Sequence, residues 1–220
     1  ISLSPDGRLV ALGGSEEYED YRSRGWQGMA ALYDLATGKP VLKIAPHLNY
    51  VTALAISPDG GTLATSSHLR DADPEAKNIW LGGDIRLWDI ATGELRHKLA
   101  REDRGTRHNI AFSPDGALLA APNGREGQVR LWDTATGAIV RTLQGNEERE
   151  PVFVLAFSPD GATLACGCGD NTVRLWDVRT ATLRRTLREF SHCIYALAFA
   201  PDGKTLVTAD KNGIVQLWEV

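Results

Sequence analysis

A four-residue sequence that returns at regular distances is the feature that most constrains how this chain can fold. Ser-Pro-Asp-Gly occupies residues 4–7, 57–60, 113–116 and 158–161, and Ala-Pro-Asp-Gly occupies 200–203. An aromatic-acidic pair follows each copy, and these pairs are Tyr33-Asp34, Trp88-Asp89, Trp132-Asp133, Trp176-Asp177 and Trp218-Glu219. The aromatic residues lie 55, 44, 44 and 42 residues apart. The chain therefore contains five copies of one unit of ~43 residues, two of them enlarged.

Each unit is predicted to form four short strands joined by tight turns. In the fourth unit the expected strands are 152–158, 162–167, 171–177 and 182–188. The Pro-Asp-Gly turn suits the first hairpin, because Pro presets φ at one corner and Gly accepts a positive φ at the next. Ala-Thr-Gly at 36–38, 91–93 and 135–137, which decays to Thr180-Ala181-Thr182, forms the third turn. No segment shows helical periodicity, so the sequence predicts an all-β chain.

The first strand of a unit is apolar on both of its faces. In the fourth unit the large residues are Phe153, Leu155 and Phe157, and the smaller residues between them are Val152, Val154 and Ala156. Strict alternation would place the two sets on opposite faces of the strand. Since both sets are apolar, both faces should be buried, the bulky face of one sheet against the small face of the next. This pattern indicates radially stacked sheets of one kind.

The run from Thr163 to Asp177 resembles the repeat of the WD-repeat family of β-propellers, and five concordant units extend the resemblance over nearly the whole chain. The resemblance implies four-stranded antiparallel blades, usually seven in a ring, that serve as a platform for protein partners. The expected fold is thus an all-β WD-repeat β-propeller over residues 1–220. Its blades are expected at about 1–45, 51–99, 107–143, 152–188 and 194–220.

The two ends of the chain differ from a full unit. The first unit holds only the last part of a first strand, and the fifth unit stops after its third strand. We therefore expect an incomplete part of a seven-bladed ring, with additional blades or domains in the same chain. A closed five-bladed ring is the alternative.

The family resemblance also implies a hydrogen-bonded set made of a His, a Ser or Thr, an Asp and the repeated Trp. The matching positions in this sequence are His47, Thr65, Trp88, Trp132, Asp170, Trp176, Thr208 and Trp218. No unit carries the full set: Gly82 replaces the Asp in unit two, Cys166 replaces the hydroxyl residue in unit four, and Asn212 replaces the Asp in unit five. Packing between blades should therefore provide most of the stability.

The amino-acid composition argues against several classes of protein, among them membrane-spanning and nucleic-acid-binding proteins. The chain is 43% hydrophobic and 24% charged, which is ordinary for a globular protein. Its longest apolar runs are far shorter than the roughly 20 residues of a membrane-spanning helix. A net charge of −4 without a basic run argues against a nucleic acid or a membrane surface as partner. Three cysteines are too few for a disulfide framework, so we expect a reducing, cytoplasmic setting.

Two insertions are candidates for binding protein or peptide partners. Residues 14–28 enlarge blade one and residues 66–83 enlarge blade two, both between the second and third strands. Connections of this kind should leave from one face of the blades, where loops on a rigid scaffold commonly bind partners. Their candidate contact residues are Tyr18, Tyr21, Arg22, Trp26, Arg70 and Trp80. The alternative is that these segments are ordinary solvated loops.

A second candidate surface is the channel rim on the same face, where the first strands begin. The residues five before the Ser or Ala of the Pro-Asp-Gly turns are Thr52, His108, Phe153 and Tyr195, with Tyr50 close by. In WD-repeat proteins such positions often line the mouth that binds partners. Ordinary packing at the rim is the alternative.

No catalytic motif or metal-ligand spacing was found, so we expect neither enzyme activity nor a cofactor or metal. Asp71, Asp73 and Glu75 lack the full calcium-loop pattern, and the three cysteines match no standard zinc spacing. The chain is expected to be a noncatalytic interaction scaffold. Two alternatives stay open, namely an enzyme with a site at the channel mouth near His108 and the sensor domain of a larger bacterial signalling protein.

Overall fold

The computed structural model describes residues 1–20, 23–47, 51–67, 83–100, 109–123, 127–144 and 150–220. These residues form five antiparallel sheets and no helix, so the all-β expectation is confirmed. The chain divides into two compact units, unit 1 (Ile1–Ile110) and unit 2 (Ala111–Val220), and each is described by itself.

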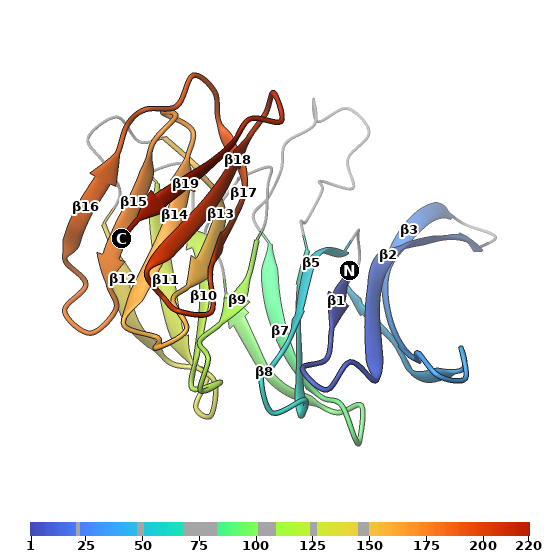
Figure 1. Ribbon diagram of the computed structural model, residues 1–220. Helices are drawn as coiled ribbons and strands as arrows, with labels where there is room; N and C mark the ends of the chain where they lie inside the picture. The colour runs from blue at the N-terminus through green and yellow to red at the C-terminus, as the bar shows by residue number, and fades with distance from the viewer. Residues whose placement is uncertain (21–22, 48–50, 68–82, 101–108, 124–126, 145–149) are drawn as a thin grey trace. The chain divides into compact units, whose positions relative to one another are not determined.

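Unit 1 contains two four-stranded sheets, blades one and two (Figure 1). The strands of blade one are β1 (Ser2–Leu3), β2 (Leu9–Asp20), β3 (Ser23–Asp34) and β4 (Pro40–His47). The strands of blade two are β5 (Val51–Ile56), β6 (Thr62–Ser67), β7 (Asp84–Asp89) and β8 (Leu95–Ala100). In both sheets each strand pairs with its neighbours in the sequence.

Unit 2 contains blades three and four, with four strands each, and blade five with three. Blade three consists of β9 (Ala111–Phe112), β10 (Leu118–Asn123), β11 (Gln128–Asp133) and β12 (Ile139–Leu143). Blade four consists of β13 (Val152–Phe157), β14 (Thr163–Cys168), β15 (Val173–Asp177) and β16 (Leu183–Leu187). Blade five consists of β17 (Ile194–Phe199), β18 (Thr205–Asp210) and β19 (Val215–Glu219).

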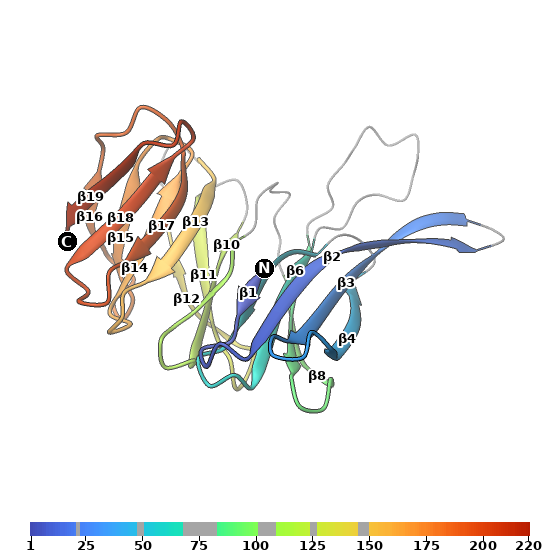
Figure 2. The same ribbon diagram turned by 45° about the vertical axis from the view of Figure 1, so that its right-hand side comes forward.

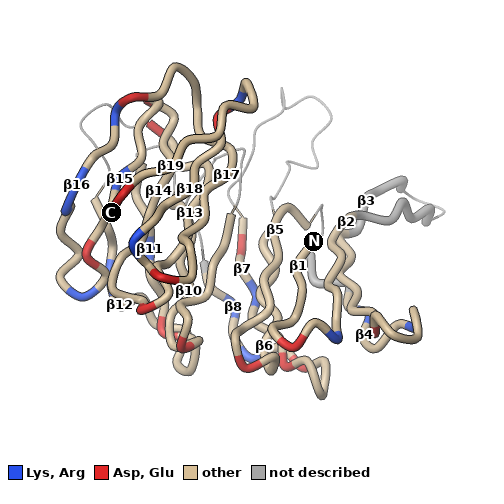
Figure 3. The backbone as a smooth tube through the Cα atoms, in the orientation of Figure 1, with Lys and Arg blue, Asp and Glu red and all other residues tan. Residues whose placement is uncertain are grey.

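The Ser-Pro-Asp-Gly turn is closed by the side chains of its own Ser and Asp. In blade four Ser158 Oγ donates to Asp160 Oδ1 at 2.5 Å and accepts from the Thr163 amide at 2.9 Å, while Gly161 has a φ of 70°. Blades one, two and three repeat this arrangement. In blade five Ala200 has no hydroxyl, and the amide of Thr205 donates to Asp202 at 3.3 Å instead. Acidic residues mark these turns in red in Figure 3.

The acidic residue that follows the repeated aromatic residue stabilises the third turn through hydrogen bonds. Asp133 Oδ1 accepts from the Thr136 amide at 2.8 Å, and the Gly137 amide donates to the Asp133 carbonyl at 2.9 Å. In blade four Ala181 makes the latter bond with Asp177, also at 2.9 Å. The decayed triplet is therefore Arg179-Thr180-Ala181, one residue earlier than the sequence comparison placed it. Ala181 occupies the glycine position with a φ of 58°.

The cores lie between neighbouring sheets of a unit. In unit 1 Trp88 and Leu63 of blade two pack in one cluster with Ala11 and Ala30 of blade one. In unit 2 Trp176 and Leu164 of blade four pack with Ala120 and Leu131 of blade three. A second cluster in unit 2 joins the small-residue face of blade four to Leu206 and Trp218 of blade five. Bulky side chains thus cover small ones, as the sequence pattern predicted.

Replacing Ala181 by Gly should stabilise unit 2. A left-handed φ costs a residue with a Cβ about 1–2 kcal/mol, and the extra freedom of Gly in the unfolded chain offsets about 0.5–1 kcal/mol of that. We expect the free energy of unfolding to rise by about 0.5–1 kcal/mol in urea denaturation. The matched control Gly137→Ala, at a φ of 72°, should lower it. Equal effects of the two variants would contradict the strain argument.

Stability should fall at acid pH as Asp89 protonates. The Arg96 guanidinium, 2.6 Å from the carboxylate, and the Thr92 amide lower the pKa of Asp89 from 3.8 to about 2. Because the folded pKa lies below the unfolded value, the contribution is complete above the unfolded pKa of 3.8 and is lost as pH falls through about 2.

This pH dependence can be measured by comparing the wild type with Asp89→Asn. The difference in free energy of unfolding should shrink between pH 5 and pH 2, while a carbon-detected NMR titration follows the Asp89 carboxyl directly. A difference that stays constant over this range would count against the assignment.

Candidate functional site

A β-bulge interrupts the first strand of blades two, four and five at the same place. The register shifts between Val51 and Ala53, between Val152 and Val154, and between Ile194 and Ala196. The extra residues are Thr52, Phe153 and Tyr195, three of the positions that the sequence analysis assigned to the rim. A bulge re-aims side chains and ends strict alternation.

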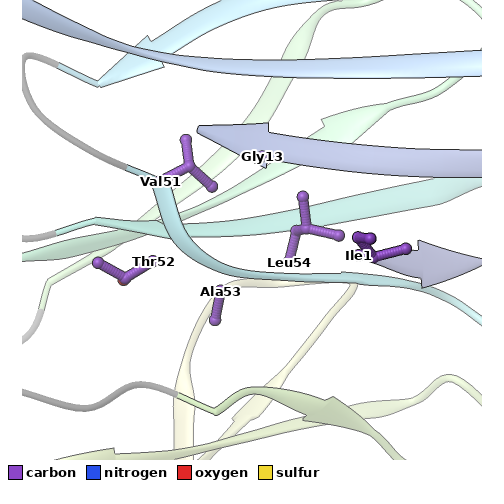
Figure 4. A pocket seen from close by; sticks show the side chains of 6 residues that line it. All are labelled: Ile1, Gly13, Val51, Thr52, Ala53 and Leu54. Atoms are coloured by element: carbon purple, nitrogen blue, oxygen red, sulfur yellow. The ribbon is translucent and has the colours of Figure 1, made fainter. Parts of the chain in front are cut away.

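Figure 4 shows the effect in blade two: Val51 and Leu54 both point toward β2 at Gly13, whereas Thr52 and Ala53 point away. A Cβ on Gly13 would lie 2.7 Å from both Leu54 Cδ2 and Val51 Cγ1. Glycine therefore permits this close approach of β2 to β5. A pocket of about 40 Å³ is all that remains there. The Thr52 hydroxyl donates to the Ser66 carbonyl at 3.1 Å.

The bulge also corrects the predicted face assignment in unit 2. Val152 joins Leu155 and Phe157 in the cluster against blade three, and Val154 belongs to the cluster against blade five. The prediction that Phe153 shares a face with Leu155 is therefore wrong, because the extra residue shifts the alternation by one. Phe153 and Tyr195 belong to neither cluster.

Phe153 and Tyr195 lie beside each other instead. Their ring centroids are 6.5 Å apart with an interplanar angle of 60°, which is an edge-to-face contact. Tyr195 is 40% exposed and Phe153 is half-buried. The structure thus brings two of the predicted rim residues together. Tyr50 and His108 lie outside the described residues.

The insertion in blade one is a continuation of the sheet rather than the loop that was expected. β2 and β3 pair without interruption from Leu9 opposite Asp34 to Asp20 opposite Ser23. Figure 2 shows the two strands running together beyond the rest of unit 1. Tyr18 lies opposite Gly25 and Trp26 opposite Glu17, although their side chains lie outside the described part. Tyr21 and Arg22 are likewise not described.

The second insertion begins at the end of β6, on the strand that pairs with β5. Val51, which Gly13 approaches, pairs with Ser67, which lies at the start of the insertion and is the last residue described there. Arg70 and Trp80, with Asp71, Asp73 and Glu75, lie outside the described residues. At its far side Asp84 is buried and contacts Arg86 at 3.0 Å and Lys98 at 3.3 Å. The sequence analysis missed Asp84, because it stands two residues after the expected acidic position.

In two blades the repeated Trp donates a hydrogen bond to a threonine hydroxyl. Trp88 Nε1 donates to Thr65 Oγ1 and Trp218 Nε1 donates to Thr208 Oγ1, each at 3.0 Å. Cys166 takes the equivalent position in blade four and Ala121 in blade three, as their registers show. Asp170 accepts from Thr172 and forms an ion pair with Arg174. The side chain of His47 lies outside the described part.

Two of the three cysteines lie in the core. Cys166 and Cys168 are buried in the cluster between blades three and four, and burial raises the pKa of the Cys168 thiol to about 12. Cys193 is partly exposed. Within the described ranges no three His, Cys, Asp or Glu side chains gather closely enough to hold a metal ion.

Comparison with known families settles the class of the repeat. The family model described as "WD domain, G-beta repeat" matches residues 38–89, 106–133, 137–177 and 182–219, which is more than half of the chain. The chain belongs to the WD-repeat family.

Known WD-repeat relatives match only in part. "Target of rapamycin complex subunit wat1" of Schizosaccharomyces pombe is 25% identical over 155 residues, covering 57% of this chain and 46% of the relative. An uncharacterized WD repeat-containing protein of Synechocystis is 28% identical over 119 residues, covering 53% and 26%. "WD repeat and SOCS box-containing protein 1" of Mus musculus is 33% identical over 94 residues, covering 43% and 20%. The chain spans less than half the length of these relatives.

A search for bilayer-spanning segments among the described residues of this WD-repeat chain yields no helix with the required length and apolarity.

The missing hydroxyl in blade four can be restored. Cys166→Thr should give Trp176 Nε1 the partner that Trp88 and Trp218 have, which raises the free energy of unfolding by about 0.5–1.5 kcal/mol. Cys166→Val is the matched control, because Val has the shape of Thr without its hydroxyl. Chemical denaturation of both variants measures the difference. Equal stability of the two would show that Trp176 does not use the hydroxyl.

Proposed function

We propose that this WD-repeat chain is a noncatalytic interaction scaffold that binds protein or peptide partners at the end of the blades where the first strands begin. The observation that carries the proposal is the contact between Phe153 and Tyr195 at two equivalent bulges. Both rings stand outside the core clusters, and Tyr195 is 40% exposed.

Aromatic side chains in such a position favour binding. They supply a large contact area with few rotatable bonds, and Tyr adds a hydroxyl that can hydrogen-bond at the border of an interface. The residues on both sides of each bulge pair with the second strand, so the backbone that carries both rings is anchored before and after the ring-bearing residue. A partner would therefore meet a preorganised surface, which lowers the entropic cost of association.

In unit 1 the proposal extends to the two insertions. The β2–β3 hairpin is paired as far as Asp20 opposite Ser23 and carries Tyr18 and Trp26 along its length. Residues 14–28 and 66–83 combine aromatic and arginine residues of the kind that dominate interface energies. The proposed contact residues are Tyr18, Tyr21, Arg22, Trp26, Arg70, Trp80, Tyr50 and His108.

The titratable groups support a binding rather than a catalytic role. A catalytic site needs perturbed groups that converge on one position. Here the carboxyl groups with lowered pKa values sit in separate turns, as Asp59 and Asp160 do, each held by its own turn hydroxyl and amide. The thiols with raised pKa values are enclosed between blades.

The relatives suggest that the chain works within a protein complex, and the cysteines suggest the cellular compartment. The relative from Schizosaccharomyces pombe is by name a subunit of a complex, which fits a chain that works through protein contacts. All three cysteines are free thiols, which suits a reducing, cytoplasmic location. The proposal includes no cofactor, nucleic acid or membrane.

The rim is tested by substitution and affinity capture. Phe153→Ala and Tyr195→Ala should each weaken capture of a specific partner by ~10-fold, because central aromatic residues contribute more than about 1 kcal/mol. Ile139→Ala is the control, since Ile139 is an exposed apolar residue at the start of an outer strand, away from the rim. Circular dichroism should show unchanged sheet content in all three.

Deletion of residues 15–27 or 67–82 tests the insertions separately. Identical partner sets from both deletions and the wild type would remove the insertions from the proposal. If the two rim variants capture the partner as well as Ile139→Ala and the wild type do, the rim is removed from the proposal.

A further inference from the structure

A groove of about 310 Å³ lies between blades three and four of unit 2. The Ser-Pro-Asp-Gly turns of the two blades form its walls, with Pro114 and Asp115 on one side and Pro159 and Asp160 on the other. Leu118, the first residue of β10, lines the groove as well. The groove therefore combines an apolar lining with one carboxyl group on each wall.

The two walls are held against each other by packing. A Cβ on Gly161 of blade four would lie 3.5 Å from Pro114 Cδ of blade three, which is van der Waals contact. Leu118 packs against the buried cluster between the same two blades. Because each turn is also closed by its own hydrogen bonds, a ligand would find the groove already formed.

Each carboxylate of the groove uses one oxygen to close its own turn. Asp115 Oδ1 accepts from the Ser113 hydroxyl at 2.5 Å and from the Ala117 amide at 3.0 Å. Asp160 Oδ1 accepts the corresponding two bonds in blade four, at 2.5 Å and 2.9 Å. Within the described ranges, neither Oδ2 takes part in a hydrogen bond or an ion pair. A carboxylate oxygen can accept further hydrogen bonds, so each wall offers one acceptor to a ligand.

The turn of blade three differs from the other Ser-Pro-Asp-Gly turns in its surrounding charge. In all four of these turns the Ser hydroxyl, followed by a backbone amide, holds the pKa of the Asp below its usual range. In blades one, two and four the charge of an arginine in the same blade lowers the pKa further, whereas among the described residues no cation does so for Asp115. The three pairs are Arg8 with Asp6, Arg96 with Asp59 and Arg184 with Asp160.

In blades two and four this arginine comes from a bulge in the fourth strand. Arg184 of blade four donates from Nη1 to Thr163 Oγ1 at 2.9 Å and from Nε to Asp177 at 3.1 Å. Arg96 repeats both contacts in blade two, at 2.8 Å and 2.6 Å. The Thr and the Asp face each other across the second and third strands. A hydroxyl and a carboxylate together thus hold the guanidinium in place.

Blade three lacks both the threonine and the arginine. Leu118 faces Asp133 where blades two and four have the threonine, and Val140 stands at the bulge of β12 where they have the arginine. Blade one has the same combination, Leu9 with Val41. A leucine cannot accept a hydrogen bond from a guanidinium, so a threonine goes with an arginine and a leucine with a valine. The consequence in blade three is an apolar groove wall without a neighbouring cation.

A ligand for this groove should have a positive charge at the end of an apolar stem. Among the described residues Arg184 is the one cation whose charge reaches either carboxylate of the groove, and it is held by Thr163 and Asp177. The groove therefore keeps a negative charge. An arginine side chain fits it, because its methylene groups pack on apolar surface and its planar guanidinium can donate to two carboxylates at once.

We propose that the groove between blades three and four binds an arginine side chain of a partner protein. The methylene stem packs on the two prolines and Leu118, and the guanidinium donates to Oδ2 of both Asp115 and Asp160. This site is separate from the proposed rim, because Phe153 lies near the start of β13 and the turn follows the end of that strand. It rests on the proposed scaffold function and adds to it a second surface with a stated partner chemistry.

The probe is the capped pentapeptide Gly-Ala-Arg-Ala-Gly, and its matched control carries citrulline, which has the shape of arginine without the charge. Both are titrated into the 220-residue chain, and backbone amide NMR shifts report affinity and position. The arginine peptide should bind ~10-fold more tightly than the citrulline peptide, because its hydrogen bonds to the carboxylates are charge-assisted. The shifted amides should lie in residues 112–118 and 157–163.

Protein variants make the test specific. Asp115→Asn and Asp160→Asn keep the oxygen that closes the turn but remove the charge, so each should weaken the arginine peptide by ~10-fold. Asp59→Asn is the matched control, since it makes the same change in the turn of blade two, and it should leave binding unchanged. The double variant Leu118→Thr/Val140→Arg copies blade four and should also weaken the arginine peptide, because an internal arginine then competes for the negative charge. Circular dichroism verifies that each variant is folded.

The proposal is overturned if neither peptide binds, if both bind the wild type equally, or if the shifted amides lie outside the two turns. It is also overturned if light scattering shows that the chain forms dimers that Asp115→Asn dissolves, because the occupant is then a second copy. Phe153→Ala should leave peptide binding unchanged. Loss of partner capture in the rim variants with normal peptide binding supports this inference alone, and the converse result removes it and leaves the rim proposal.

Discussion

Packing of a bulky sheet face against a small-residue face is the interaction on which the rest of the structure depends. In unit 1 Trp88 and Leu63 lie over Ala11 and Ala30, and in unit 2 Trp176 lies over Ala120. The sheets approach so closely that a Cβ on Gly167 would lie 3.0 Å from Ile194 Cβ of blade five, as a Cβ on Gly13 would lie 2.7 Å from Val51 Cγ1 of blade two. A core packed this closely tolerates few substitutions. The blades therefore differ from one another mainly at strand ends, turns and outer edges.

The β-bulges explain how an apolar strand can serve both the core and the surface. Without the extra residue, Phe153 would point where Leu155 and Phe157 point, into the core against blade three. The bulge lets Val152 take that place and leaves Phe153 next to Tyr195. The same shift lets Ile194 and Leu197 share a cluster in blade five. One inserted residue thus places an aromatic ring outside the core cluster, while Val152 fills the position in that cluster.

The repeat was enough to predict the strands of blade four to within two residues at each end, because each strand is bounded by a turn whose residues have a conformational reason to be there. The bulges could not be predicted, because every residue of this strand is apolar. The sequence pattern is therefore the same whether or not Phe153 is an extra residue that shifts the register. The hairpin of blade one was missed because residues 15–25 alternate poorly in hydropathy, and cross-strand pairing rather than sequence pattern sets their conformation. Of the candidate site, Phe153 and Tyr195 were identified by position, and their contact required coordinates.

Differences between blades are as informative as their likeness. A family pattern alone treats Leu9, Thr62, Leu118, Thr163 and Thr205 as interchangeable first residues of a strand. Their partners show otherwise, because a threonine hydroxyl and a facing carboxylate together satisfy a guanidinium, and a leucine in that position cannot. The choice at one strand therefore constrains a residue 34 positions later in blade two and 21 positions later in blade four. Blade five keeps the same facing pair of a threonine and a carboxylate, Thr205 opposite Glu219.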